Sequence, residues 1–105
     1  MARAKLQAFQ EKECTTSTYC KALAHPARII IFNLLSEHGV ATFTEIKGSV
    51  PLHQSTMMQH LEMMHRANLI QHAPHTSGVT GYRLRAAAVI EMKDYLEEVI
   101  GELRA

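Results

Sequence analysis

The sequence lacks any long run of apolar residues. Runs such as Ile29 to Phe32 are only a few residues long, whereas a helix that crosses a membrane needs about 20 apolar residues in succession. The N-terminus also shows no continuous apolar segment followed by a cleavage site, so no secretion signal is visible. We therefore expect a cytoplasmic protein with no membrane partner.

The sequence also lacks a strong excess of charge of either sign. Its net charge is +1, which argues against a nucleic-acid binder, because such proteins are usually basic. The distribution of charge is more informative than the total. Residues 20–85 contain six Lys or Arg against three acidic residues, and all seven histidines lie between His25 and His75. This middle part is the expected face for an anionic partner, whereas the C-terminal segment is acidic.

Patterns that would indicate an enzyme are missing. We find no Gly-rich phosphate loop, no nucleophile with a base at a useful spacing, and no paired carboxylates outside the last predicted helix. The sequence therefore predicts neither an enzyme nor a bound cofactor.

Cysteine is scarce, with Cys14 and Cys20 as the only two. On one continuous helix they would be separated by about 9 Å along the axis and by about 120° around it. This separation exceeds what a disulfide within one chain allows. Three interpretations stay open: small apolar residues in a reducing compartment, a thiol sensor, or part of a Cys/His metal site. The histidines themselves show no clear metal-ligand spacing.

The 105 residues favour one domain spanning 1–105. A first helix is expected over residues 5–23, although the run Thr15–Thr18 weakens its pattern. The next helix is predicted from Pro26 to His38, because proline suits the first turn and Gly39 can end the helix. A short helix capped by Thr42 or Thr44 should follow and end near Gly48, after a very short strand at 40–42.

A further helix is predicted from about Gln54 to Ala67. Met57, Leu61 and Met64 recur at helical spacing and should lie in the core. The helix opens on the polar run Gln54, Ser55 and Thr56. Serine and threonine there are good helix-start residues, because their oxygens accept hydrogen bonds from free N–H groups. The same side chains are also free to meet a partner.

The rest of the sequence predicts a β-hairpin and a last helix. Strands are expected at 69–72 and 82–85, with Pro74, Ser77, Gly78 and Gly81 in the loop. A helix over 86–103 carries the apolar seam Val89, Met92, Leu96, Val99 and Leu103. The fold class is therefore mainly α with a small β-hairpin, in the order α-α-α-α-β-β-α of a winged helix-turn-helix.

Two motifs resemble the ArsR family of small bacterial repressors. "KALAHPARIIIFNLLSEHG" resembles that family's opening motif, and "HQSTMMQHLEMMHRANLI" resembles its recognition-helix motif. "GYRL" matches the return strand of its wing, and the resemblance covers about residues 20–100. The sequence departs from the pattern at His53, Met57 and Met58. Because position 58 touches DNA in some relatives, the operator read here can differ.

The resemblance implies a homodimer joined through its N- and C-terminal helices, 5–23 and 86–103. It implies a helix-turn-helix over 43–67, a wing over 69–85, and a partly palindromic double-stranded DNA operator. The protein would then be a transcriptional repressor released by an inducer or a redox signal. Some relatives sense arsenicals, oxidants or sulfide through thiols, which makes Cys14 and Cys20 candidate sensors. The two familiar metal sites look absent, since "VATFTEIKG" has no cysteine and "RAAAVIEMKDYLEEVIG" no histidine.

The residues expected to contact DNA lie at the start of the predicted recognition helix and on the wing. They are Gln54, Ser55, Thr56, Gln59, His60, Arg83 and Arg85. Gln54 and Gln59 can read base edges, and the arginines can bind phosphate, together with His72 and His75. For His60 two interpretations stay open, a DNA contact and a structural role, because in the family motif this histidine points partly inward. The alternative function is a winged-helix protein-interaction module that does not bind DNA.

Overall fold

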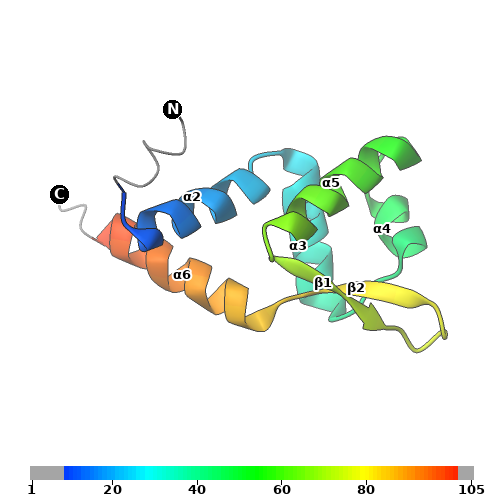
Figure 1. The fold of residues 1–105 in the computed structure, drawn as a ribbon. Coiled ribbons are helices and arrows are strands. Elements are labelled where there is room, and N and C mark those ends of the chain that lie inside the picture. Colours follow the sequence, from blue (N-terminus) through cyan, green and yellow to red (C-terminus); the bar gives the residue numbers. More distant parts are fainter. Residues whose placement is uncertain (1–8, 102–105) are drawn as a thin grey trace.

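The computed structural model describes residues 9–101, and its elements follow the predicted order (Figure 1). The part of the chain that it describes is mainly helical, with one antiparallel hairpin. The elements are α2 (Glu11–Ala22), α3 (Pro26–His38), α4 (Phe43–Ser49), α5 (Gln54–Arg66), β1 (Ile70–Pro74), β2 (Thr80–Leu84) and α6 (Ala86–Gly101). Among these helices, none is long and apolar enough to cross a membrane.

Helix α3 begins and ends at the predicted residues. Pro26 occupies its first turn, and the Nδ1 atom of His25 accepts a hydrogen bond of 3.0 Å from the Ala27 N–H. Gly39 ends the helix with φ of 76°, a conformation that favours glycine. His25 is therefore the N-cap residue of α3.

Helix α4 is fixed by a capping box. The Thr42 hydroxyl accepts a hydrogen bond from the Glu45 N–H, and the Glu45 carboxylate accepts one from the Thr42 N–H. Thr42, rather than Thr44, is thus the cap, and Ile46 is buried.

Helix α5 begins at Gln54, as predicted, and ends at Arg66. Met57, Leu61 and Met64 are buried along one side. Asn68 follows with φ of 59° and turns the chain towards the hairpin. Its short polar side chain makes this left-handed conformation accessible.

The hairpin is longer than predicted. Its strands extend through Pro74, which pairs with Thr80, so Pro74 is a strand residue and not part of the loop. Proline fits there because a two-stranded sheet has only edge strands, whose outward N–H groups need no partner. The strand expected at 40–42 is reduced to one bridge, in which Ala41 and Tyr82 exchange two backbone hydrogen bonds.

Helix α2 is continuous through the threonine run. The hydroxyls of Thr16 and Thr18 donate hydrogen bonds to the carbonyls of Lys12 and Cys14, four residues earlier. The expected helices 5–23 and 86–103 reach beyond α2 and α6 into residues 5–8 and 102–103, which lie outside the described residues.

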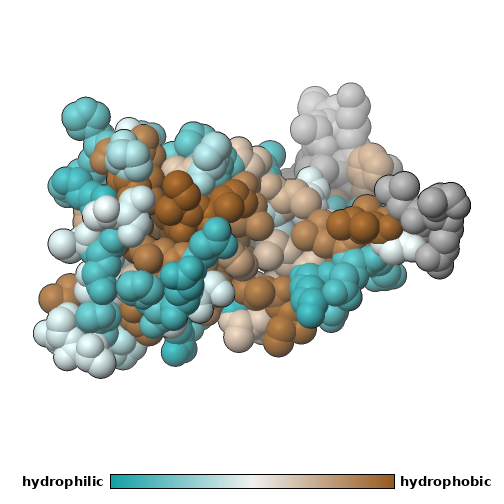
Figure 2. All heavy atoms as spheres, turned by 180° about the vertical axis from the view of Figure 1, so that it is seen from behind, coloured by the Kyte–Doolittle hydropathy of each residue, from teal (hydrophilic) through white to brown (hydrophobic). Residues whose placement is uncertain are grey.

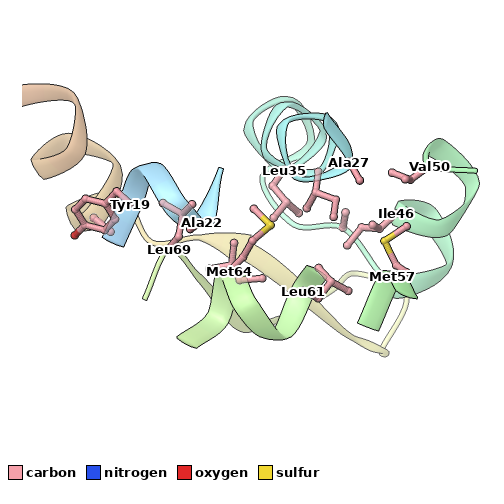
Figure 3. Close-up of a cluster of buried hydrophobic side chains, with 14 of the residues drawn as sticks. Tyr19, Ala22, Ala27, Leu35, Ile46, Val50, Met57, Leu61, Met64 and Leu69 are labelled. Carbon is pink, nitrogen blue, oxygen red and sulfur yellow. The ribbon is translucent and has the colours of Figure 1, made fainter. Parts of the chain in front are cut away.

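The core joins all the helices to the hairpin (Figure 3). Its largest fully buried side chains are Ile31, Leu35, Ile46, Met57, Leu61, Met64, Leu69 and Ile70. Helices α2 and α6 lie side by side and extend away from the body formed by α3, α4, α5 and the hairpin (Figure 1). We call this pair of helices the arm. It is held by Tyr19, whose buried hydroxyl donates a 2.6 Å hydrogen bond to Glu91.

Candidate nucleic-acid interface

The candidate interface is built on the first turn of α5. The chain enters this helix from a turn after α4, in which the Leu52 N–H donates to the Val50 carbonyl at 2.8 Å. His53 is the N-cap residue, with an extended backbone, and its side chain makes no capping hydrogen bond. The leading N–H groups of α5 are therefore left to solvent or to an anion.

The polar side chains of this turn face outward. Gln54, Ser55 and Gln59 are exposed, and Thr56 is half-buried. Because His53 is the N-cap, Ser55 and Thr56 do not cap the helix. The helix-start interpretation of these residues therefore does not describe the structure.

His60 points inward. Only 8% of its surface is exposed, and its Nδ1 atom accepts a hydrogen bond of 3.1 Å from the Nε–H of Arg28. Its burial, followed by the charges of His25 and Arg28, lowers the pKa of its imidazole. The structure thus places His60 in the structural role that the sequence left open, and we omit it from the DNA contacts proposed below.

The two predicted wing arginines differ in their surroundings. Arg83 is exposed on β2, opposite Gln71 on β1. With the Gln71 amide turned over, its oxygen lies 2.8 Å from both Nε and Nη2 of Arg83. Arg85 is half-buried, and its Nη1 donates to the Asn68 carbonyl at 2.7 Å. Arg83 is the more available of the two cations.

The wing histidines also differ. His72 is exposed and its ring lies against Tyr82 and His65. His75 is half-buried, because its Nε2 lies 3.1 Å from Glu45 and its Nδ1 accepts from the Ser77 N–H. His75 therefore connects the wing to α4 instead of presenting its ring to a phosphate.

Lys47 was not among the predicted contacts. It is exposed on α4 and lines a hollow of about 470 Å³ with Pro51, His53 and Gln54. Because Lys47 and Gln54 border the same hollow, a phosphate that approaches Gln54 would also meet the lysine ammonium. A basic residue on the first helix of a predicted helix-turn-helix is the signal that could have identified it.

The candidate sensor residues lie on the arm. Cys14 is half-buried and Cys20 is exposed, and both belong to the single helix α2. Their separation on this helix rules out a disulfide between them without a break in α2. Across residues 9–101, no cluster of three or more His, Cys, Asp or Glu side chains is arranged to hold a metal ion.

Two helices joined by a tight turn, then a two-stranded hairpin, define a winged helix-turn-helix, and this chain has that fold. No protein-family model and no curated protein matches the sequence. Solved structures of ArsR-type regulators do match, so the fold is of the ArsR type.

Three of these structures illustrate the similarity. An ArsR family transcriptional regulator aligns with a TM-score of 0.70 and 20% identity over 91% of this chain and 98% of that one. An ArsR-like transcriptional regulator from Rhodococcus sp. RHA1 aligns with a TM-score of 0.73 and 16% identity, over 89% of this chain and 86% of that one. The transcriptional repressor BigR from Xylella fastidiosa aligns with a TM-score of 0.64 and 21% identity, over 94% of this chain and 96% of that one. Because these sequence identities are low, the similarity shows a shared fold and nothing further about this chain.

Proposed function

We propose that this protein is a sequence-specific DNA-binding transcriptional repressor that acts as a homodimer. The observation that carries the proposal is the division of α5 into two faces. Met57, Leu61 and Met64 anchor one face in the core, while Gln54, Ser55 and Gln59 are exposed on the other. In a winged helix-turn-helix this exposed face is the one that enters a major groove. The fold is shared with proteins described as transcriptional regulators and as a repressor.

Each exposed group has a matching partner on duplex DNA. The Gln54 amide can pair with an adenine edge through two hydrogen bonds, and Gln59 lies about one helical turn further along. The open N–H groups at the start of α5 can bind a phosphate, with Ser55 and Thr56 beside them. Lys47 on α4 and Arg83 on β2, both exposed, supply cations for phosphates.

The dimer is proposed on the apolar surface of the arm. Phe9, just before α2, and Val99 and Ile100 on α6 are each more than half exposed, and apolar side chains gather towards the outer end of α6 (Figure 2). A second copy that covers them would remove apolar area from water. It would also place two α5 helices on one side of the dimer, so the operator should be partly palindromic.

Selection from a library of randomised 30-bp duplexes tests the function. The wild-type protein should enrich a sequence, and its affinity for that duplex should fall steeply as salt rises, because phosphate contacts release counterions. Gln54→Ala should lower affinity for the selected duplex by about 1–3 kcal/mol and affinity for a scrambled duplex much less. Arg83→Ala should weaken both duplexes and reduce the salt dependence.

Matched controls exist on surfaces outside the interface. Asn33→Ala removes an exposed amide from α3, and Lys93→Ala removes an exposed cation from α6. Both should bind as the wild type does. If no duplex is enriched and random duplex is not bound at low salt, the chain is instead a winged-helix protein-interaction module.

We also propose that a signal releases the operator, with Cys14 and Cys20 as the candidate thiols. Two observations support these candidates. Cys20 is exposed and Cys14 is half-buried, and both lie on α2, in the arm that the proposed dimer uses. The selected duplex should be released by arsenite, an oxidant or sulfide. A Cys14→Ser/Cys20→Ser variant should stay bound under the same treatment, and equal release of both proteins would exclude a thiol mechanism.

A further inference from the structure

Arg28 connects three helices. From α3, its Nε donates to His60 Nδ1 on α5 at 3.1 Å. Its Nη1 donates to the Lys21 carbonyl at the end of α2 at 2.8 Å, lies 3.4 Å from the Ala22 carbonyl, and approaches the Met63 sulfur on α5 at 2.7 Å. One guanidinium therefore holds the end of α2 and the middle of α5 together.

This connection matters because part of the boundary between α2 and α5 is open. A groove of about 380 Å³ lies between them, lined by Thr18, Lys21 and Ala22 on one side and by Gln59, Met63 and Arg66 on the other. With a groove between the two helices, little side-chain packing fixes their relative position there. Arg28 can do so, because it bonds to Lys21, Ala22 and Met63, which line this groove from both sides.

The connection requires an unprotonated Nδ1 on His60, since a ring nitrogen that carries a proton cannot accept from Arg28. The charged and titratable side chains that face His60 are Arg28 and His25, both from the start of α3. The His25 ring lies 4.4 Å from the His60 ring and uses its own Nδ1 to accept from the Ala27 N–H. From α2 the contact is indirect, through the Lys21 and Ala22 carbonyls that Arg28 binds.

We propose that Arg28 and His60 position the recognition helix α5 relative to the arm, and that a proton on His60 breaks this connection and weakens sequence-specific DNA binding. The DNA part of the proposal rests on the function proposed above. Arg28 is half-buried, and its donors are engaged by His60, Lys21 and Met63. It therefore acts through His60 as a positioning residue and not as a DNA contact. His60 directly follows Gln59 and lies within two turns of Gln54, so a shift at His60 moves the base-reading side chains.

The lowered pKa of His60 sets the pH range in which this occurs. In the unfolded chain the ring protonates near its usual pKa of about 6.5, and in the folded protein only at lower pH. Stability from the connection is therefore complete above about pH 6.5 and falls as the pH drops towards the folded pKa. The acid form brings a second positive charge next to Arg28, which disfavours the linked geometry.

A measurement without DNA tests the connection itself. His60→Asn keeps an acceptor at the position of Nδ1 but does not titrate, and His38→Asn is a control at an exposed histidine on α3. In NMR spectra recorded between about pH 8 and pH 5, the amide signals of Gln54 to Gln59 should shift in the wild type and in His38→Asn. They should shift less in His60→Asn, in which the ring of His60 is gone and only the imidazole of His53 remains beside these amides. Equal shifts in all three proteins would overturn the proposal.

A measurement with the selected duplex then tests its effect on recognition. The ratio of affinities for the selected and scrambled duplexes should fall in the wild type as the pH drops through the folded pKa of His60, by at most about tenfold per pH unit for a single proton. It should hold constant in His60→Asn. Arg28→Lys, which keeps the charge but not the fork of donors, should lower the ratio already at about pH 8.

The two measurements separate the two proposals. Failure to enrich any duplex would remove the DNA function, yet the NMR comparison would still confirm or overturn the connection. An affinity ratio that falls with acid in His60→Asn as it does in the wild type would overturn the role of His60 in recognition. Arg28→Lys with a wild-type ratio and unchanged α5 signals would do the same for Arg28.

Discussion

Gly81 shows how a single residue attaches the wing to the rest of the domain. A Cβ atom at this position would lie 2.7 Å from the Ala41 carbonyl oxygen and 2.9 Å from a methyl group of Val40. The same Ala41 accepts a 2.8 Å hydrogen bond from the Tyr82 N–H and donates one of 3.0 Å to its carbonyl. Glycine is therefore required here by the close approach of two backbones, not by an unusual φ.

Gly81→Ala should separate β2 from Ala41 and destabilise the protein by about 1–3 kcal/mol, the usual range for overpacking. Thermal unfolding should show a lower Tm, and hydrogen exchange at Tyr82 should become faster. Gly48→Ala is the matched control, because a Cβ there meets nothing within 4 Å and alanine favours the α4 helix. If Gly81→Ala unfolds at the same Tm as Gly48→Ala, the close approach of the Gly81 and Ala41 backbones would be contradicted.

Patterns of single residues in the sequence predicted where α3 begins and ends. They did not predict contacts between side chains that lie far apart in the sequence. Pro26 and Gly39 act on neighbouring backbone, so their roles followed from position alone. The inward orientation of His60 depends on Arg28, 32 residues away. The spacing of residues along α5 gives no information about a partner on another helix. For this reason the sequence left His60 with two interpretations.

At the scale of elements, α4 and the wing are joined by Glu45. Its carboxylate accepts from the Thr42 N–H in the capping box, and its Oε1 lies 3.1 Å from His75 Nε2 at the end of β1. The backbone hydrogen bond from Thr42, then its hydroxyl partner and the histidines His75 and His38, lower the pKa of Glu45. One carboxylate thus fixes both the start of α4 and the position of the hairpin.

Glu45→Gln tests this double role through its pH dependence. Because the folded pKa of Glu45 is lowered, its stabilising effect is present above the usual carboxyl range and is lost as the pH falls through the folded pKa. Between about pH 5 and pH 3, the wild-type Tm should therefore fall more than that of Glu45→Gln. Glu37→Gln, which removes an exposed carboxylate from α3, should keep the wild-type pH profile. Identical profiles for wild type and Glu45→Gln would show that Glu45 does not connect α4 to the wing.

The elements themselves were predictable where their signals were local. The bounds of α3 followed from Pro26 and Gly39, and the start of α5 followed from its apolar spacing after a polar turn. The hairpin strands were predicted too short because Pro74 looked like a loop residue. Its pairing with Thr80 depends on the absence of a third strand beside β1, which is a property of the assembled sheet.

At the scale of the whole molecule, the arm leaves apolar surface uncovered. Met92 is buried against the domain, and Val89 and Leu96 are partly buried, so the predicted seam of α6 is used mainly within one chain. Val99 continues this seam but is 63% exposed, and its neighbour Ile100 is equally exposed. The outer end of the arm is thus where a second copy would find unburied apolar side chains.

A double substitution Val99→Asp/Ile100→Asp tests the dimer at this place. Covering two such side chains contributes about 1.5–3 kcal/mol each in each copy, and buried unpaired carboxylates would add a further cost. We expect the wild type to elute as a dimer in size-exclusion chromatography with light scattering. The double variant should elute as a folded monomer with a lower Tm, because it loses the stabilisation that association provides.

Val79→Asp is the matched control, because it places a carboxylate on an equally apolar and exposed site, 59% exposed, at the tip of the wing. It should remain a dimer. A dimeric Val99→Asp/Ile100→Asp protein would mean that the copies join through another surface. A monomer that still binds the selected duplex with wild-type affinity would mean that one α5 helix is enough, since two linked half-sites should bind far more tightly than one.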